Sequence, residues 1–234
     1  MRLGIFGAGK LSSVLARLAL SAGHQVDIAG SSDLKKAGDA KASARSQWAY
    51  EVASADIVIL AIPITAVQAL PADLLAGRTV IDATNYWWES DGHRPELADP
   101  TTSTSETVAT WLPGATVVKA LNHASVWELE NLGRPKGHKE RRGIAIAGDS
   151  PAAVSAVSDL VDSLGFEPVV AGVLAEGVRF EPGTDIFGAD ATAAELAGLL
   201  ERFWTSQRGL VVARARAAHA DAARADAAPT QAAS

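Results

Sequence analysis

The 234-residue sequence contains no cysteine. Disulfides, thiol nucleophiles and thiolate-bound metal clusters are therefore excluded, and any redox chemistry must belong to a bound cofactor. No apolar run approaches the ~18–20 residues that a membrane-spanning helix requires. The first residues lead directly into a short apolar segment and a glycine turn, without the pattern of a secretory leader. We therefore expect a cytoplasmic protein with no membrane partner.

Positive charge is also scarce. The formal net charge is −6, whereas a nucleic-acid partner requires a concentrated basic stripe. The densest basic stretch runs from Arg134 to Arg142, but glycine and proline interrupt it, so we interpret it as a solvated loop. The histidines show no metal-ligand spacing. We expect neither a nucleic-acid partner nor a metal site.

Short apolar runs alternate with helical periodicity over the first half of the chain. Strands are expected at residues 2–6, 25–29, 57–62, 79–82 and from 115 onward, and helices at about 11–22, 65–75 and 104–112. The run IVILAIP, from Ile57, is a continuous β-branched segment typical of a parallel strand covered on both faces. This alternation predicts an α/β fold with a Rossmann-type, doubly wound parallel sheet.

After Leu121 the pattern becomes that of a smaller α/β unit. A helical piece VWELENL, strands at about 143–147 and 167–171, and a helix at about 151–164 are expected. From Ala189 onward alanine dominates, and leucines at helical spacing predict one long helix as far as about Ala218. We therefore divide the chain into a first domain at 1–121, a small α/β domain with the terminal helix at 122–218, and a frayed tail at 219–234.

The segment GAGKLS, residues 7–12, lies between an expected strand and an expected helix and matches the dinucleotide fingerprint G-x-G-x-x-S. Gly7 permits the tight turn, and Gly9 lets the main chain approach a pyrophosphate. The helix that begins at Lys10 presents free N–H groups and the positive end of its dipole. Ser12 replaces the third glycine and is small enough for close packing. This placement predicts dinucleotide binding; the alternative is a turn in a fold that binds nothing.

The next strand ends in GSSDLKK, residues 30–36, with no acidic residue directly at its end. Sites specific for NAD place an Asp or Glu there, which accepts hydrogen bonds from the ribose 2′-OH and repels a 2′-phosphate. Serine hydroxyls and Lys35 or Lys36 suit a phosphate instead. NADP is therefore the preferred cofactor, although Asp27 or Asp33 in an NAD-type role is the alternative.

Polar and apolar residues follow two later strands, where ligands lie in open α/β sheets. Ala61, Ile62 and Pro63 form an apolar lip that flanks a cofactor, unless Pro63 only terminates the strand. Asn122 and His123 should face the same cleft, and both are candidate catalytic residues. His123 is a candidate general acid or base, although a lone histidine is more often structural.

A loop at 82–97 brings together Tyr86, Trp87 and Trp88. Exposed aromatic residues in a connection require an explanation. They either stack on a planar ring or pack onto the second domain or a partner subunit, and packing is slightly favoured. Asn85 is placed to hydrogen-bond the nicotinamide region.

Taken in order, these segments resemble the NADPH-dependent F420 reductase family, also called F420-dependent NADP oxidoreductases. The resemblance covers most of the chain, through GAGKLS, GSSDLKK, LAIP, DATNYW, TSETVATWLPGATVVKALNHA, GIAIAGDSPAAV, LGFEPVVAG and EPGTDIFG. It implies a Rossmann oxidoreductase that passes hydride between NADP(H) and a 5-deazaflavin, with coenzyme F420 as co-substrate. A homodimer is left open.

The resemblance also implies site residues. The pyrophosphate would be wrapped by Gly7, Ala8, Gly9, Lys10 and Leu11. Ser31, Ser32 and Lys36 would hold the 2′-phosphate, and the nicotinamide would be bordered by Ile62, Pro63, Asn85, Ala120 and Asn122. Ser32 stands where better-known members carry arginine, which shifts the positive charge to the lysines.

Two other functions compete with this one. The chain could hold NADP(H) without turnover, as a redox sensor. It could also be a small-substrate imine or carbonyl reductase, although imine reductases of the pyrroline-carboxylate type bring an all-helical C-terminal domain, which the strands expected near residues 143 and 167 would contradict.

Overall fold

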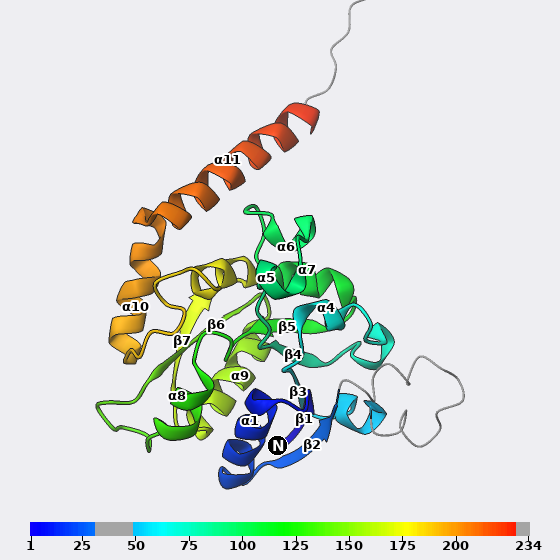
Figure 1. Ribbon diagram of the computed structural model, residues 1–234, viewed down its shortest axis with the longest axis vertical. Helices are drawn as coiled ribbons and strands as arrows, with labels where there is room; N and C mark the ends of the chain where they lie inside the picture. Colours follow the sequence, from blue (N-terminus) through cyan, green and yellow to red (C-terminus); the bar gives the residue numbers. More distant parts are fainter. Residues whose placement is uncertain (31–48, 228–234) are drawn as a thin grey trace, which may run out of the picture.

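The computed structural model describes residues 1–30 and 49–227, and of residues 226 and 227 the backbone alone. At its centre lies a seven-stranded sheet in the order β2-β1-β3-β4-β5-β6-β7 (Figure 1). The strands are β1 (Arg2–Phe6), β2 (Gln25–Ala29), β3 (Ile57–Leu60), β4 (Thr79–Asp82), β5 (Thr116–Lys119), β6 (Gly143–Gly148) and β7 (Glu167–Gly172). Neighbouring strands are parallel except for β5 and β6. The predicted α/β fold with a Rossmann-type sheet is confirmed.

The described helices connect and cover these strands. They are α1 (Lys10–Ser21), α4 (Ile64–Val67), α5 (Trp88–Asp91), α6 (Pro95–Ala98), α7 (Thr104–Trp111), α8 (Val126–Asn131), α9 (Pro151–Ser163), α10 (Ala193–Arg202) and α11 (Gln207–Ala227). Three short 3-10 helices are η1 (Ala72–Leu74), η2 (Leu174–Phe180) and η3 (Phe203–Thr205). Reciprocal capping boxes start α7, α8 and α10, because a Ser or Thr cap followed three residues later by Glu satisfies otherwise unpaired N–H groups.

The continuous apolar strand β3 shows why the sheet is covered on both faces. Its alternate side chains point in opposite directions. Ile57 and Ile59 join a core cluster with α1 and α9, whereas Val58 and Leu60 join a second cluster with α4 and α7. A strand buried on both faces needs apolar residues at every position, as the sequence predicted.

The second α/β unit continues the same sheet. Strand β6 pairs antiparallel with β5, and β7 then pairs parallel with β6. A third cluster packs β6 against η2 and α10 through Ala145, Ala147, Phe180, Leu196 and Leu200. The C-terminal half is thus not all-helical. The division into domains at residue 121 stays a prediction.

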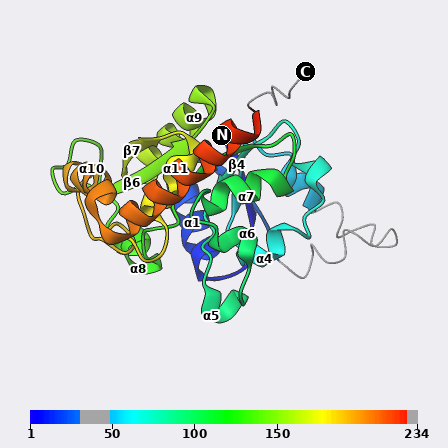
Figure 2. The ribbon, with the colours of Figure 1, turned by 90° about the horizontal axis from the view of Figure 1, so that it is seen from above.

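Two helix predictions were wrong. The helix expected at 65–75 is the short α4 followed by η1, because Pro71 lacks an N–H group and cannot continue a helix. The single long helix expected from Ala189 is α10 and α11, separated by η3. This break lets Phe203 and Val212 pack against Val178. Helix α11 then extends away from the sheet (Figures 1 and 2).

The expected frayed tail and the basic loop also need correction. Residues 219–227 are helical, as the end of α11, whereas 228–234 lie outside the described residues. In the basic loop Arg141 is 4% exposed. It forms ion pairs with Asp162 and Glu167, both at 2.6 Å. One arginine of this loop is therefore a buried anchor. None of the described helices is long and apolar enough to span a membrane.

Candidate active site

The strand ends meet in one row across the sheet. In the parallel register Ala29, Phe6, Leu60, Asp82 and Lys119 are successive partners, from β2 to β5. The backbone pairing continues one step further, because Gly7 N–H donates to Ala29 O and Ala61 N–H donates to Phe6 O, both at 2.8 Å. The predicted site residues that follow β1, β3, β4 and β5 are therefore brought to one edge. In open α/β sheets this edge carries the ligand, at the point where the strand order reverses, here between β1 and β3.

Gly7 occupies a position that no other residue could take without strain. Its φ is +138°, a conformation that side chains disfavour. A Cβ atom there would lie 2.2 Å from Ala61 O and 2.5 Å from Ser12 Oγ. The turn therefore passes so closely over β3 and α1 that only glycine fits, as the fingerprint requires.

Gly9 differs from Gly7 because its surroundings are open. A Cβ at Gly9 would meet no atom within 4 Å. Gly9 is the N-cap of the 12-residue helix α1, no side chain caps that end, and its first turn holds no acidic residue. Free N–H groups and the positive dipole end therefore face an open pocket lined by Ala8, Gly9 and Lys10 together with Val126 and Glu130 of α8. This geometry suits an anion such as a pyrophosphate. Leu11 is partly buried and packs against the core below the turn.

The residues predicted to hold a 2′-phosphate, Ser31, Ser32 and Lys36, lie outside the described residues.

Two asparagines join the ends of β4 and β5. Asn85 Nδ2 donates to Asn122 O at 2.8 Å, and Asn122 Nδ2 donates to Asn85 Oδ1 at 3.1 Å and to Phe180 O at 3.0 Å. Asn122 is 4% exposed, and among the described residues its Oδ1 has no hydrogen-bond partner. A buried acceptor without a donor at a strand end is a candidate for a ligand N–H group. Leu121, which precedes it, has φ +65°, and such backbone strain is concentrated at functional sites.

The apolar lip lies on the same edge. Ala61 and Ile62 follow β3, and Pro63 forms the N-cap of α4. Ile62 is 7% exposed, and Ala120, which follows β5, is fully buried. These residues place apolar surface on the same sheet edge as the asparagine pair, as expected near a ring-binding site.

His123 has the geometry of a structural histidine. It is fully buried, and burial lowers its pKa to about 4, with Lys119 as a second cause. Nε2 accepts a hydrogen bond from the Ala145 N–H at 2.9 Å, so the neutral ring carries its proton on Nδ1, which has no partner among the described residues. The ring packs edge-on against Phe180. Catalysis by His123 stays a prediction. Its burial and its hydrogen bond to the Ala145 N–H both weigh against it.

A buried ion pair lies one layer below the edge. Lys119 and Asp82 are both fully buried, with Nζ 3.5 Å from Asp82 Oδ2. Lys119 also donates to Ser105 Oγ at 3.0 Å and to Thr104 Oγ1 at 3.2 Å, and Thr84 and Ser105 donate to the Asp82 carboxylate. The pair is thus fully hydrogen-bonded, which is the condition for tolerating buried charge.

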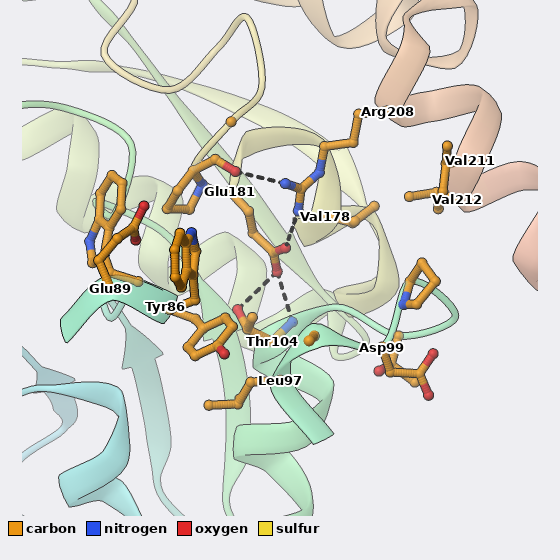
Figure 3. Close-up of a pocket in the computed structure, with 17 residues that line it drawn as sticks. Tyr86, Glu89, Leu97, Asp99, Thr104, Val178, Glu181, Arg208, Val211 and Val212 are labelled. Carbon is orange, nitrogen blue, oxygen red and sulfur yellow. Dashed lines mark hydrogen bonds and ion pairs between the residues drawn. The ribbon is translucent and has the colours of Figure 1, made fainter. Parts of the chain in front are cut away.

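The network continues from Thr104 to a second ion pair. Glu181 is 4% exposed, and its Oε1 accepts from Thr104 N at 2.7 Å and from Thr104 Oγ1 at 2.8 Å. Its Oε2 lies 3.2 Å from Arg208 of α11. Figure 3 shows Glu181 at the centre of these contacts. Polar groups from α7, η2 and α11 therefore converge beside the sheet edge.

This second pair lines a pocket of about 370 Å³ walled by aromatic and aliphatic side chains, which we call the aromatic pocket (Figure 3). Its lining includes Tyr86, Trp87, Trp88, Glu89, Leu97, Asp99, Thr104, Val178, Glu181, Arg208, Val211 and Val212. Ligand pockets are typically ~300–1,000 Å³, apolar, with a few convergent polar groups. Two of its lining residues, Tyr86 and Glu181, directly follow Asn85 and Phe180 in the sequence, and Phe180 O accepts a hydrogen bond from Asn122. The pocket therefore lies close to the asparagine pair.

The packing explanation of the aromatic loop is confirmed for Trp87, whereas stacking on a planar ring stays a prediction. Trp87 packs edge-on against Phe187, with ring centroids 5.4 Å apart, which is contact with the second unit. Trp88 is 67% exposed and lines the pocket. The loop is therefore anchored by packing and still presents ring surface to a ligand.

Sequence reasoning missed Lys119, Glu181 and Arg208. Lys119 occupied an otherwise apolar strand, ATVVKA, and a charged residue at a buried strand position was a usable signal. Nothing local distinguished Glu181 or Arg208 from solvated charges. Among the described residues no group of histidine, aspartate and glutamate side chains is suited to hold a metal.

Comparison with known proteins agrees with this geometry. Residues 2–86 match the family described as NADP oxidoreductase, coenzyme F420-dependent. Escherichia coli K12 protein YjhV is 35% identical over 96 residues, which are 41% of this chain and 68% of YjhV. The chain belongs to this family. It is accordingly an NADP-dependent oxidoreductase by class. The fingerprint, the ends of β1 to β4 and Asn85 lie within the matched residues, whereas β5 and Asn122 lie beyond them.

Two more distant relatives extend the likeness along the chain. A crystal structure from Arthrobacter sp. FB24, provisionally described as an F420-dependent NADP reductase, is 26% identical, with a TM-score of 0.60, and the match covers 88% of this chain and 94% of that one. Rat metalloreductase STEAP3 is 28% identical over 183 residues, or 77% of this chain. The present chain spans about a third (36%) of that metalloreductase.

Proposed function

We propose that this protein transfers hydride between NADP(H) and a planar, electron-poor acceptor bound in the aromatic pocket. The observation that carries the proposal is the adjacency of an uncapped helix N-terminus with an open Gly9, an asparagine pair with an unpaired oxygen, and the aromatic pocket along one sheet edge. These features fit, in order, a pyrophosphate, a nicotinamide amide and an acceptor ring.

The chain's own groups would bind and orient the dinucleotide. Backbone N–H groups at the start of α1 would hold the pyrophosphate, with Ala8 and Lys10 beside it. Asn122 Oδ1 would accept a hydrogen bond from the carboxamide of the nicotinamide, and Asn85 would keep Asn122 in place. Ala61, Ile62, Pro63 and Ala120 would exclude water from the ring.

The reduced nicotinamide supplies a hydride, a proton with two electrons, from its C4 carbon. The protein's task is then alignment in a dry cleft rather than covalent catalysis. No side-chain nucleophile is required, in agreement with a sequence that lacks cysteine. A 5-deazaflavin ring, the reactive part of coenzyme F420, is the acceptor that the family and the Arthrobacter structure suggest.

The test is to mix the purified protein with NADPH and an oxidised deazaflavin and to follow the absorbance of both. We expect the deazaflavin band to bleach as NADPH is consumed, at a rate proportional to protein concentration. If calorimetry shows that NADPH binds but no planar acceptor is ever reduced, the chain is a redox sensor and the proposal fails.

From the sequence alone we also propose that Ser31, Ser32 and Lys36 hold the 2′-phosphate. Replacing Lys36 with alanine should weaken NADP binding by about tenfold, since a charge-assisted contact contributes roughly 1.5 kcal/mol. NAD binding should not change. Calorimetry with both dinucleotides checks this, and equal losses for NAD and NADP would contradict it.

A further inference from the structure

We propose that the aromatic pocket selects a planar ring with a cationic side chain over the same ring with a phosphate side chain. This inference deepens the proposed function and rests on it, because it names the chemical class of acceptor for that same pocket. In coenzyme F420 the two parts behave differently: the pocket walls fit the deazaflavin ring, whereas the charges of the lining disfavour its anionic side chain.

The walls of the pocket are suited to a cation above a ring face. The Tyr86 hydroxyl donates to Gly92 O at 2.9 Å and accepts from the Arg94 N–H at 3.1 Å, so this ring is held in place. Trp88 contributes a largely exposed indole. Tryptophan and tyrosine faces attract cations through their quadrupole.

The charged groups of the lining also favour a cationic ligand. The lining residues include three carboxylates, from Glu89, Asp99 and Glu181, and one cation, Arg208. Arg208 is already engaged, because its guanidinium pairs with Glu181 and donates to Pro182 O at 2.8 Å. Its charge is therefore balanced before any ligand binds.

Two carboxylates are left over. Glu89 has no ion-pair partner in the described part of the chain. Asp99 accepts hydrogen bonds from the side chain and the backbone of Thr101, which lower its pKa and keep it ionised. These two exposed carboxylates have no ion-pair partner among the described residues, so they attract a cation at the pocket and repel a phosphate, with a strength that solvent reduces.

Other charges near the pocket do not reverse this balance. Arg216 of α11 donates to Thr101 O and Ala175 O and lies 3.9 Å from Glu176, and it is not among the lining residues. His219 of the same helix acts on Asp99 only as a minor cause of its lowered pKa. The charged side chains that line the pocket therefore leave it with a negative formal charge, from three carboxylates and one guanidinium.

The experiment compares three oxidised 5-deazaflavins that share one ring and differ only in the side chain at N10. One side chain ends in trimethylammonium, one in a hydroxyl and one in a phosphate. Calorimetry on protein saturated with NADP⁺ measures their affinities without turnover. We expect the order trimethylammonium, hydroxyl, phosphate, with at least about fivefold between the first and the last, the size of an exposed cation–π contact. The difference should shrink as salt is added.

A charge variant locates the effect. Glu89→Gln should reduce the ratio of trimethylammonium to phosphate affinity by about twofold or more, because it removes one carboxylate from the lining. Asp159→Asn, an equal change of net charge on the exposed face of α9, should leave the ratio unchanged.

The outcomes separate this inference from the proposed function. If NADP⁺ binds and the phosphate ligand binds as tightly as the trimethylammonium ligand, the charge inference is overturned while hydride transfer stands. If Glu89→Gln and Asp159→Asn change the ratio of trimethylammonium to phosphate affinity equally, the selection arises from the overall charge of the protein and not from the pocket. If NADP⁺ itself fails to bind, the proposed function has failed.

Discussion

At the scale of single residues, the two glycines of the fingerprint have separable tasks. Gly7 is required by the backbone, with φ +138° and Ala61 O only 2.2 Å from any added Cβ, whereas Gly9 faces open space. We predict that Gly7→Ala destabilises the fold by on the order of 3 kcal/mol. Gly9→Val should leave stability nearly unchanged but weaken NADP binding by about tenfold or more, because the branched side chain occupies the pyrophosphate path.

Chemical denaturation and calorimetry of both glycine variants check this pair. The critical result is that Gly7→Ala lowers stability whereas Gly9→Val lowers only the affinity for NADP. Equal effects of the two substitutions on stability would show that Gly9 is structural and that the open surface above it is not a binding surface.

The buried Lys119–Asp82 pair predicts a large loss of stability when only one partner is removed. Lys119→Met leaves the Asp82 carboxylate buried without its cation, which typically costs ~3–5 kcal/mol. Adding Asp82→Asn to the same protein should recover much of that loss. Urea unfolding of the single and double variants measures it, and a double variant as unstable as the single one would refute the pairing.

At the scale of elements, the short helix α8 depends on its cap. Ser125 Oγ accepts from the Glu128 N–H at 3.1 Å, and the Glu128 carboxylate accepts from the Ser125 N–H at 2.6 Å. Ser125→Ala should lower the free energy of unfolding by about 1 kcal/mol. Ser125→Thr, which preserves a cap hydroxyl, should lower it much less. Thermal unfolding of the two variants distinguishes a capping role from a loss of packing.

This helix also connects stability to the site. Val126 and Glu130 of α8 line the pocket at the N-terminus of α1, and Glu130 forms an ion pair with Arg17 of α1. A frayed α8 should therefore loosen the pyrophosphate pocket. We expect Ser125→Ala to weaken NADP binding slightly, in proportion to its effect on stability.

At the scale of the whole molecule, stability should depend on the protonation of His123. Its pKa in the folded protein is lowered to about 4 by burial and by Lys119, whereas an exposed histidine has a pKa near ~6.5. The unfolded state therefore binds more protons between these values, and stability falls as pH drops from 6.5 towards 4, by up to about 3 kcal/mol. Above pH 6.5 this contribution is constant.

The measurement is urea unfolding between pH 5 and pH 7, for the native chain and for His123→Gln. Glutamine offers an acceptor oxygen to the Ala145 N–H but does not titrate in this range. His24, whose pKa is also lowered, is present in both proteins and cancels in the comparison. Parallel pH profiles for the two proteins would show that His123 is accessible to protons when folded.

The assembly and location of the protein stay predictions. The sequence pattern leads us to expect a cytoplasmic location, and it leaves a homodimer open. Size-exclusion chromatography with light scattering would establish the first.

What the sequence by itself determined is the set of local features. The strands, the glycine turn and the capped helices follow from side-chain patterns within a few residues, since backbone geometry limits which patterns suit each element. Parallel strands also bring their carboxyl ends to one edge of the sheet, so the positions of Gly7, Pro63, Asn85 and Asn122 after predicted strands indicate that all four lie along that edge.

Only the tertiary structure decided which distant groups complete the site. Glu181 reaches Thr104 across 77 positions, and Arg208 reaches Glu181 across 27. The break between α10 and α11 likewise arises from packing of Phe203 and Val212 on Val178. Such contacts depend on how helices and loops dock over the sheet, and buried ion pairs form only where that docking excludes water and supplies every hydrogen bond.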